Sequence, residues 1–293
     1  MSLDYRQARS FLFAPGNHER RAAKVFQSGA EVAILDLEDA VAVDEKIAAR
    51  DAVVRALQAP RACLGFVRVN APETVWCWGD LHAVVGPGLD GLMVPKAEDA
   101  AALQALDWVL TQLERERGLA AGGLCLLPII ETARGERALE AIAGASPRVR
   151  RLAFGGADYS LDLGLQWTAG EQEFDYLRAR LVHVSRAAGL APPVDTVTVQ
   201  VKEPERFRAS SARARQFGLH GKLLIHPDQV PLCHEAFAPT AAEVARARRI
   251  IEAFAAAEAE GIASLRVDGE FIDYPVVEKA RRVLAAAAVG PGV

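Results

Sequence analysis

The sequence predicts an α/β fold, a (β/α)8 TIM barrel, from three observations. Eight short apolar or β-rich runs recur between residues 10 and 226, and buried parallel strands have this appearance in a sequence. Segments rich in Ala, Glu, Arg and Leu separate most of these runs. The first run lacks the glycine-rich phosphate turn that an open doubly wound sheet, the structural alternative, would need.

The strands and helices follow one another in a regular order. The predicted strands span residues 10–15, 31–39, 65–70, 91–96, 124–131, 151–158, 194–202 and 222–226. The predicted helices include residues 17–28, which open on the capping residue Asn17, and residues 44–58, 98–117 and 171–189. The third connection, residues 71–88, contains Trp76, Cys77 and Trp78 together with Pro and Gly. We expect a packed loop with a short helix there.

The pattern changes after the eighth predicted strand. Residues 241–261 form a long Ala/Glu/Arg helix, residues 264–273 contain the Asp268-Gly269 pair that is typical of a hairpin turn, and residues 276–288 form a final helix. We therefore expect two parts, a catalytic barrel at residues 1–235 and a C-terminal lid and oligomerisation extension at residues 236–293. Such an extension can cover its own barrel or that of a neighbouring subunit.

The composition excludes several classes of function. A net charge of −4 argues against binding to nucleic acid or to an anionic membrane. The four cysteines, Cys63, Cys77, Cys125 and Cys233, lie far apart without a CxxC pair, so neither zinc nor a disulfide framework is indicated. No signal peptide or membrane-spanning run is apparent. We expect a cytoplasmic protein with reduced cysteines.

Two carboxylates end neighbouring predicted strands. Glu131 and Asp158 each follow an apolar run, and the C-terminal ends of parallel strands are where barrel enzymes keep their chemistry. Two carboxylates with no basic residue beside them in the sequence are typical of a site for a hard divalent cation such as Mg²⁺. The alternative is that both are solvated loop acids.

A second polar group follows the earlier strands. Asp36 and Glu38 lie on one face of the second strand, Arg68 lies within the third, and Lys96 ends the fourth. An arginine in a short apolar strand needs a carboxylate partner or a bound substrate carboxylate. Both interpretations remain open for Arg68. For Arg9, beside the first strand, a structural ion pair is the stronger interpretation, and substrate binding is the alternative.

The ordered motifs resemble those of the citrate lyase β-subunit-like family, within the HpcH/HpaI-type aldolases. The resemblance rests on RSFLFAP at residues 9–15, LDLEDAV at 35–41, VRVN at 67–70, PK at 95–96, ETA at 131–133, FGGADY at 154–159, GK at 221–222, IHP at 225–227 and IDYPVV at 272–277. It covers almost the whole chain. The Trp76-Cys77-Trp78 loop departs from the family pattern.

The resemblance implies a (β/α)8 barrel that binds Mg²⁺ through Glu131 and Asp158. It also implies a homo-oligomer, a trimer or hexamer, in which a lid acid matching Asp273 reaches a neighbouring subunit. The implied activity is that of a carbon–carbon lyase acting on a thioester of coenzyme A or of an acyl-carrier protein. Citramalyl-CoA, malyl-CoA and a citryl thioester are the implied substrates, and the products are an acyl thioester and a keto acid or glyoxylate.

The chemistry assigns roles to these residues. Arg68 would grip the substrate carboxylate or polarise the oxygen that becomes the carbonyl, and Asp273 would protonate the thioester enolate. Asp36 and Glu38 would hold metal-bound waters or orient Arg68 and Lys96. Two other functions remain open: a malate-synthase-like condensing enzyme or thioesterase, and a non-catalytic subunit that docks a carrier protein or a lyase partner.

Overall fold

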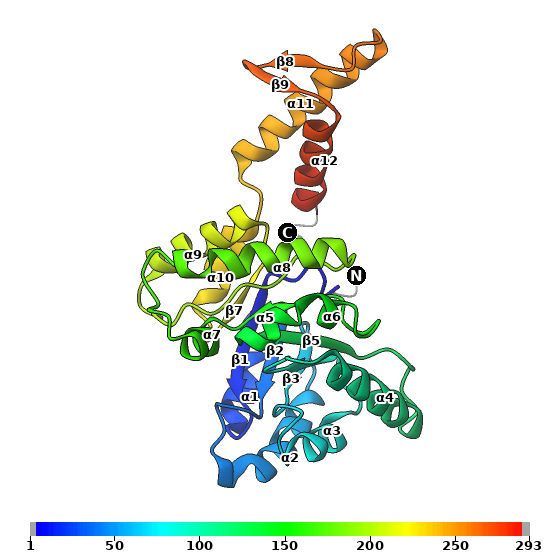
Figure 1. Cartoon of the computed structure of the whole chain (residues 1–293), viewed down its shortest axis with the longest axis vertical. Coiled ribbons are helices and arrows are strands. Elements are labelled where there is room, and N and C mark those ends of the chain that lie inside the picture. Colours follow the sequence, from blue (N-terminus) through cyan, green and yellow to red (C-terminus); the bar gives the residue numbers. More distant parts are fainter. Residues whose placement is uncertain (1–3, 289–293) are drawn as a thin grey trace. The chain divides into compact units, whose positions relative to one another are not determined.

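The computed structural model describes residues 4–288, which fall into two compact units that divide between Ala236 and Phe237. Figure 1 shows the strands of the first unit with helices around them. No helix in this described range is long and apolar enough to cross a membrane.

The first unit is built on a sheet of seven parallel strands in the order β6-β5-β4-β3-β2-β1-β7. The strands are β1 (Ser10–Pro15), β2 (Val32–Asp36), β3 (Leu64–Arg68), β4 (Gly91–Val94), β5 (Cys125–Ile130), β6 (Ala153–Phe154) and β7 (Lys222–Leu224). Parallel pairing brings all their carboxyl ends to one side, here called the mouth. In the register, Asp36 lies beside Arg68.

The sheet is a nearly closed barrel of seven strands, so the prediction of eight is wrong in one place. Residues 194–202 form no regular strand; Val194 makes a single bridge to Ala153, and Asp195 a single bridge to Lys222. The charged side chain of Asp195 bonds Arg178 and Lys222. The sequence pattern predicted a longer strand at residues 194–202. The structure has only short backbone pairing there, together with the side-chain bonds of Asp195.

Helices connect the strands, as the sequence predicts. They are α1 (Glu19–Val25), η1 (Val43–Glu45), α2 (Lys46–Leu57), α3 (Cys77–Val84), α4 (Ala100–Glu116), α5 (Ala133–Arg137), α6 (Leu139–Ala143), α7 (Gly156–Leu163), η2 (Gln172–Phe174), α8 (Asp175–Ala187), α9 (Pro204–Phe217) and α10 (Gln229–Phe237). Asp99 caps α4 by accepting the N–H of Ala101. The short α3 confirms the expectation for the connection of residues 71–88.

Alternating residues of the strands fill the barrel interior. Phe11, Ile34, Phe66, Met93 and Leu127 are fully buried members of one apolar cluster. Because side chains alternate along a strand, Asp36 and Arg68, two positions beyond Ile34 and Phe66, lie on the same face as this cluster and nearer the mouth. The packed apolar interior therefore lies directly beneath the polar side chains at the carboxyl ends of the strands.

The second unit is a helix, a hairpin and a helix, as the sequence predicts. It contains α11 (Ala241–Ala259), β8 (Leu265–Val267), β9 (Glu270–Ile272) and α12 (Tyr274–Ala288). Asp268 and Gly269 both have positive φ, 51° and 85°, as a two-residue type I′ turn requires. The unit has its own apolar cluster, which includes Ile250, Phe254 and Ile272.

Candidate active site at the carboxyl ends of the strands

The first element of the site is an ion pair between neighbouring strands. Arg68 donates from Nε to Asp36 Oδ1 at 2.7 Å and from Nη2 to Asp36 Oδ2 at 2.6 Å. The carboxylate of Asp36 also accepts the backbone N–H groups of Glu38, at 2.9 Å, and Ala40, at 3.1 Å. Asp36 therefore fixes both the guanidinium and the turn after β2, and it is almost completely buried.

Glu38 joins this pair to the next strand. Its Oε2 lies 2.9 Å from Arg68 Nη1, and its Oε1 accepts from Lys96 Nζ at 2.6 Å. Burial raises the pKa of Glu38, and the two cations oppose that rise. Asp36 and Glu38 both contact Arg68, as expected for two residues on one face of the strand.

Lys96 links these residues to the two carboxylates predicted as metal ligands. Its backbone N–H donates to Glu131 Oε1 at 2.7 Å, and its Nζ lies 3.6 Å from Asp158 Oδ1. Glu131 is buried, whereas Asp158 lies in the first turn of α7 and is partly exposed. The structure thus brings Asp158 and Glu131 together with the rest of the polar group, within reach of one small ligand.

The electrostatics of this cluster favour a bound cation. Burial, and then the negative charge of Asp158, raise the pKa of Glu131 to about 8. A Cβ built at Gly155 would come within 2.3 Å of Glu131 Oε2, so the carboxylate can take its present position only because residue 155 has no side chain. No group of three or more His, Cys, Asp or Glu side chains that could hold a metal occurs between residues 4 and 288. Further ligands of a metal here would come from water or substrate.

Comparisons with known proteins assign the chain to a family. Residues 9–227 match the family model described as HpcH/HpaI aldolase/citrate lyase. The chain belongs to this family. It is 37% identical to the citrate lyase subunit beta of Escherichia coli over 285 residues, which cover 96% of this chain and 94% of that protein.

Two further relatives cover nearly the whole chain. The L-malyl-CoA/beta-methylmalyl-CoA lyase of Cereibacter sphaeroides is 33% identical, over 96% of this chain and 95% of that protein. The structure of CitE from Mycobacterium tuberculosis in complex with magnesium, acetoacetate and coenzyme A is 29% identical, with a TM-score of 0.79, over 97% of this chain and 99% of that one. The predicted family, barrel class and enzyme class, a lyase, are confirmed.

One candidate substrate-binding residue of this family member does not lie at the mouth. Arg9 precedes β1, and Glu31 precedes β2. The Nε of Arg9 donates to Glu31 Oε1 at 3.1 Å. Both residues lie at the amino ends of these strands, opposite the mouth. Arg9 has the structural ion pair that the sequence favoured, so we leave it out of the proposed substrate site.

Asp273 belongs to the second unit, between β9 and α12. Its Oδ1 accepts the backbone N–H of Val276 at 3.3 Å, which is the geometry of a helix N-cap. The side chain is only partly buried. The carboxylate therefore has a local structural role at the start of α12.

Sequence reasoning missed the residues that support the site from behind. Lys46 and Asn70 are buried and bond the backbone of the segment that carries Glu38. Asn70 lies in the VRVN motif at residues 67–70, and this motif is part of the family resemblance in the sequence. Nothing in the sequence indicates that Lys46 is buried, because a lysine in the first turn of an amphipathic helix is ordinarily solvated.

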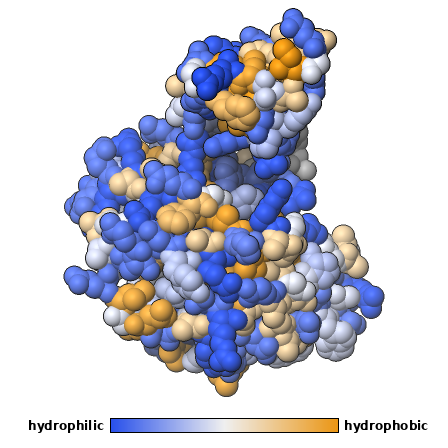
Figure 2. Space-filling model, turned by 45° about the horizontal axis from the view of Figure 1, so that its top comes forward, coloured by the Kyte–Doolittle hydropathy of each residue, from blue (hydrophilic) through white to orange (hydrophobic). Residues whose placement is uncertain are grey.

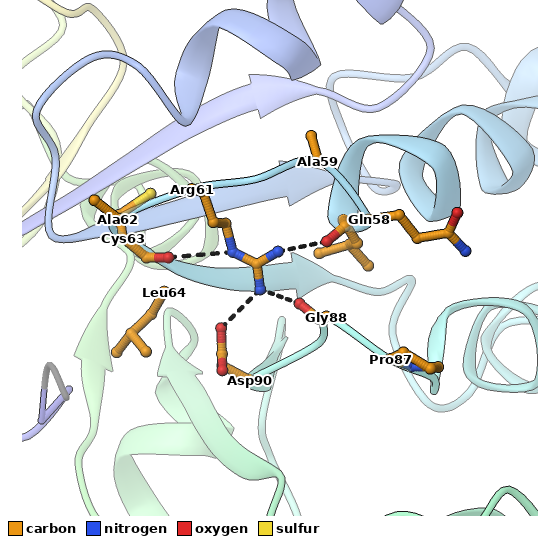
Figure 3. Close-up of a pocket in the computed structure, with 10 residues that line it drawn as sticks. Gln58, Ala59, Arg61, Ala62, Cys63, Leu64, Pro87, Gly88 and Asp90 are labelled. Atoms are coloured by element: carbon orange, nitrogen blue, oxygen red, sulfur yellow. Dashed lines mark hydrogen bonds and ion pairs between the residues drawn. The ribbon is translucent and has the colours of Figure 1, made fainter.

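A pocket of about 610 Å³ lies away from the mouth, at the amino end of β3 (Figure 3). Arg61 lies within it and bonds the backbone oxygens of Leu57, Cys63 and Gly88 and the carboxylate of Asp90. Because these partners occupy the guanidinium, the pocket offers little free positive charge to an anionic ligand. The polar group at the mouth remains the better candidate for chemistry.

Proposed function

We propose that the protein is a Mg²⁺-dependent carbon–carbon lyase that cleaves a 3-hydroxyacyl-CoA thioester into an acyl-CoA and a keto acid or glyoxylate. The observation that carries the proposal is the continuous set of contacts from Arg68 through Glu38 and Lys96 to Glu131 and Asp158. The family membership and the lyase relatives support it.

We further propose that Glu131 and Asp158 hold the Mg²⁺ ion. The two carboxylates repel one another, and this repulsion raises the pKa of Glu131 and would be relieved by a cation bound between them. When bound, Mg²⁺ would act as a Lewis acid on the substrate's hydroxyl and carboxylate oxygens. The magnesium complex of the CitE relative supports this assignment.

The residues around the metal site have distinct tasks in the proposal. Arg68 presents its guanidinium to the substrate carboxylate or to the oxygen that becomes the carbonyl, held in orientation by Asp36. Glu38 orients both Arg68 and Lys96 from one carboxylate. Lys96 adds positive charge beside Asp158 and contacts the substrate there.

Asp273 is the proposed acid. Breaking the carbon–carbon bond leaves a thioester enolate, whose carbon must receive a proton. A carboxylic acid on a segment that closes over the mouth, from the same or a neighbouring subunit, would deliver it in a water-poor site. In the proposal, Asp273 caps α12 through Oδ1, which accepts the N–H of Val276, and delivers the proton from its other oxygen.

A carrier-protein thioester is the second candidate substrate. It is favoured by one observation, the 37% identity with a citrate lyase subunit beta over most of both chains. The two candidates share the site and the reaction and differ in what carries the acyl group. A carrier protein would need a docking surface, which free CoA does not.

A thioester panel tests the proposal. Malyl-CoA, citramalyl-CoA, citryl-CoA and the corresponding carrier-protein thioesters are assayed with Mg²⁺ for release of keto acid or glyoxylate. We expect cleavage of at least one CoA thioester, its loss on chelation, and its loss in Glu131→Gln. Asp90→Asn, which alters a carboxylate at the other end of the barrel, is the matched control and should retain activity. Failure of every thioester would reject the proposed function.

A further inference from the structure

The backbone beside the Asp36–Arg68 pair is held by side chains from two other elements. Lys46 donates from Nζ to the backbone oxygens of Leu37, at 3.0 Å, and Glu38, at 2.8 Å. Asn70 donates from Nδ2 to the same oxygen of Leu37 at 2.9 Å. The peptide groups that set the direction of the Glu38 side chain are thus bonded from α2 and from the end of β3.

Lys46 is an unusual residue to find in this place. It is only 5% exposed, and no carboxylate pairs with it in the described part of the chain. Its ammonium instead lies 5.4 Å from the centre of the Trp76 ring. A buried ammonium without an ion pair is costly, so the two carbonyl bonds and the aromatic face compensate for its loss of water. This gives a role to the Trp76 loop that departs from the family pattern.

A second layer fixes Asn70. The fully buried carboxylate of Asp80 accepts from Asn70 N at 3.0 Å and from Asn70 Nδ2 at 2.7 Å. Arg50 in turn donates to Asp80 at 2.8 Å and to the backbone oxygen of Trp76 at 3.0 Å. The loop with Trp76, the helix α3 with Asp80 and the helix α2 with Arg50 and Lys46 therefore form one bonded support.

We propose that Lys46 and Asn70 are positioning residues of the lyase: they set the backbone of Leu37 and Glu38 so that the Glu38 carboxylate meets Arg68 and Lys96 at once. This inference rests on the proposed function of the mouth. Glu38 reaches Arg68 at 2.9 Å and Lys96 at 2.6 Å. A rotation of its peptide would break one of these contacts and release Lys96 from its place beside Asp158.

The first test is Lys46→Met with Arg61→Met as a matched control. Both substitutions remove a cation that bonds backbone carbonyls: Lys46 is buried behind the mouth, and Arg61 is partly buried at the other end of the barrel. We expect kcat to fall about 10-fold or more in Lys46→Met, with a smaller change in KM, because displaced catalytic groups lose rate steeply. Arg61→Met should lower the melting temperature and keep kcat. Equal losses of kcat in both variants would overturn the proposal.

Two further variants keep the proposal testable if Lys46→Met does not fold. Asn70→Ala removes the other bond to Leu37 and should lower kcat in the same way. Lys46→Arg keeps a cation that can reach the carbonyls and should recover part of the loss. Wild-type kcat in Asn70→Ala, or no recovery with Lys46→Arg while Lys46→Met is impaired, would contradict the positioning role.

A crystal structure of Asn70→Ala or Lys46→Met gives an answer that does not depend on the reaction. We expect the Glu38 carboxylate to lose its contact with Arg68 or with Lys96. If both contacts persist at their present distances, the positioning role is rejected even where the lyase assay succeeds. If the contacts break and no thioester is cleaved by the wild type, the geometry stands and the proposed function fails.

Discussion

Lys96 donates its backbone N–H to Glu131 at 2.7 Å while its own backbone has a φ of 46°. A non-glycine residue in the left-handed region costs about 1 kcal/mol or more and persists where its surroundings hold it. Here the same residue contacts Glu38 and Asp158 through its ammonium. One strained residue therefore joins the two halves of the candidate site, the Arg68 half and the proposed metal half.

Replacing Glu131 by Gln should change how stability depends on pH. In the metal-free protein the pKa of Glu131 is raised from 4.5 to about 8 by burial and by Asp158. Between these values the native state keeps a proton that the unfolded chain has lost, so stability falls as pH rises. Glu131→Gln, which stays neutral, should flatten this slope in thermal unfolding between about pH 5 and about pH 8.

The same variant tests the metal site. Mg²⁺ should raise the melting temperature of the wild type, more at about pH 8 than at about pH 6, because the cation must displace the proton of Glu131. Glu131→Gln should show little response to Mg²⁺, whereas Asp90→Asn should respond as the wild type does. An unchanged Mg²⁺ response in Glu131→Gln would remove this residue from the proposed ligands.

Arg68→Lys should fold and lose most of its activity. The guanidinium makes two parallel hydrogen bonds to Asp36, and its Nη1 contacts Glu38. An ammonium cannot reproduce this planar arrangement. We expect kcat/KM to fall by about 10² or more. Steady-state kinetics together with a melting curve measures both effects. Near-normal kinetics would mean that Arg68 is only a structural partner of Asp36 and Glu38.

Asp273→Asn should separate catalysis from helix capping. Asn is as good an N-cap as Asp, so the bond to Val276 and the melting temperature should be kept. Asn cannot deliver a proton, and kcat should fall by about 10²–10⁴ if Asp273 is the acid. Mg²⁺ and CoA affinity should not change. A preserved kcat would leave Asp273 as a cap and return the acid role to Asp36 or Glu38.

We expect a homo-oligomer, a trimer or a multiple of trimers, when light scattering is measured at micromolar concentration. Apolar patches interrupt the hydrophilic surface in Figure 2. In the second unit, Phe271 is 63% exposed and Tyr274 54% exposed, and large exposed apolar groups mark association surfaces. Phe271→Ser should weaken association. A monomeric wild type would contradict this expectation.

The period of two along strands made much of the site predictable. It placed Asp36 and Glu38 on one face, and parallel pairing then predicted that Arg68, Lys96, Glu131 and Asp158 would meet at the same end of the barrel. These side chains do meet. Arg9 does not join them, because a residue before a strand lies at the end opposite to a residue after it.

Other features depend on contacts that no local pattern contains. Residues 194–202 have the composition of a strand, but the segment pairs only briefly while Asp195 bonds Arg178 and Lys222, which come from distant parts of the chain. Lys46 is buried because Trp76 and two carbonyls surround it. Such burial follows from tertiary packing and cannot be predicted from helical spacing.

Residues 194 and 195 lie between β6 and β7 and pair only briefly with each of these strands. β1, β2 and β3 are held to one another by longer ladders of backbone bonds, whereas single bridges at Val194 and Asp195 carry the closure. Amide protons exchange fastest where few backbone bonds must open. We therefore expect faster amide exchange in the part of the wall that leads into α7 and Asp158 than in the strands that carry Asp36 and Arg68.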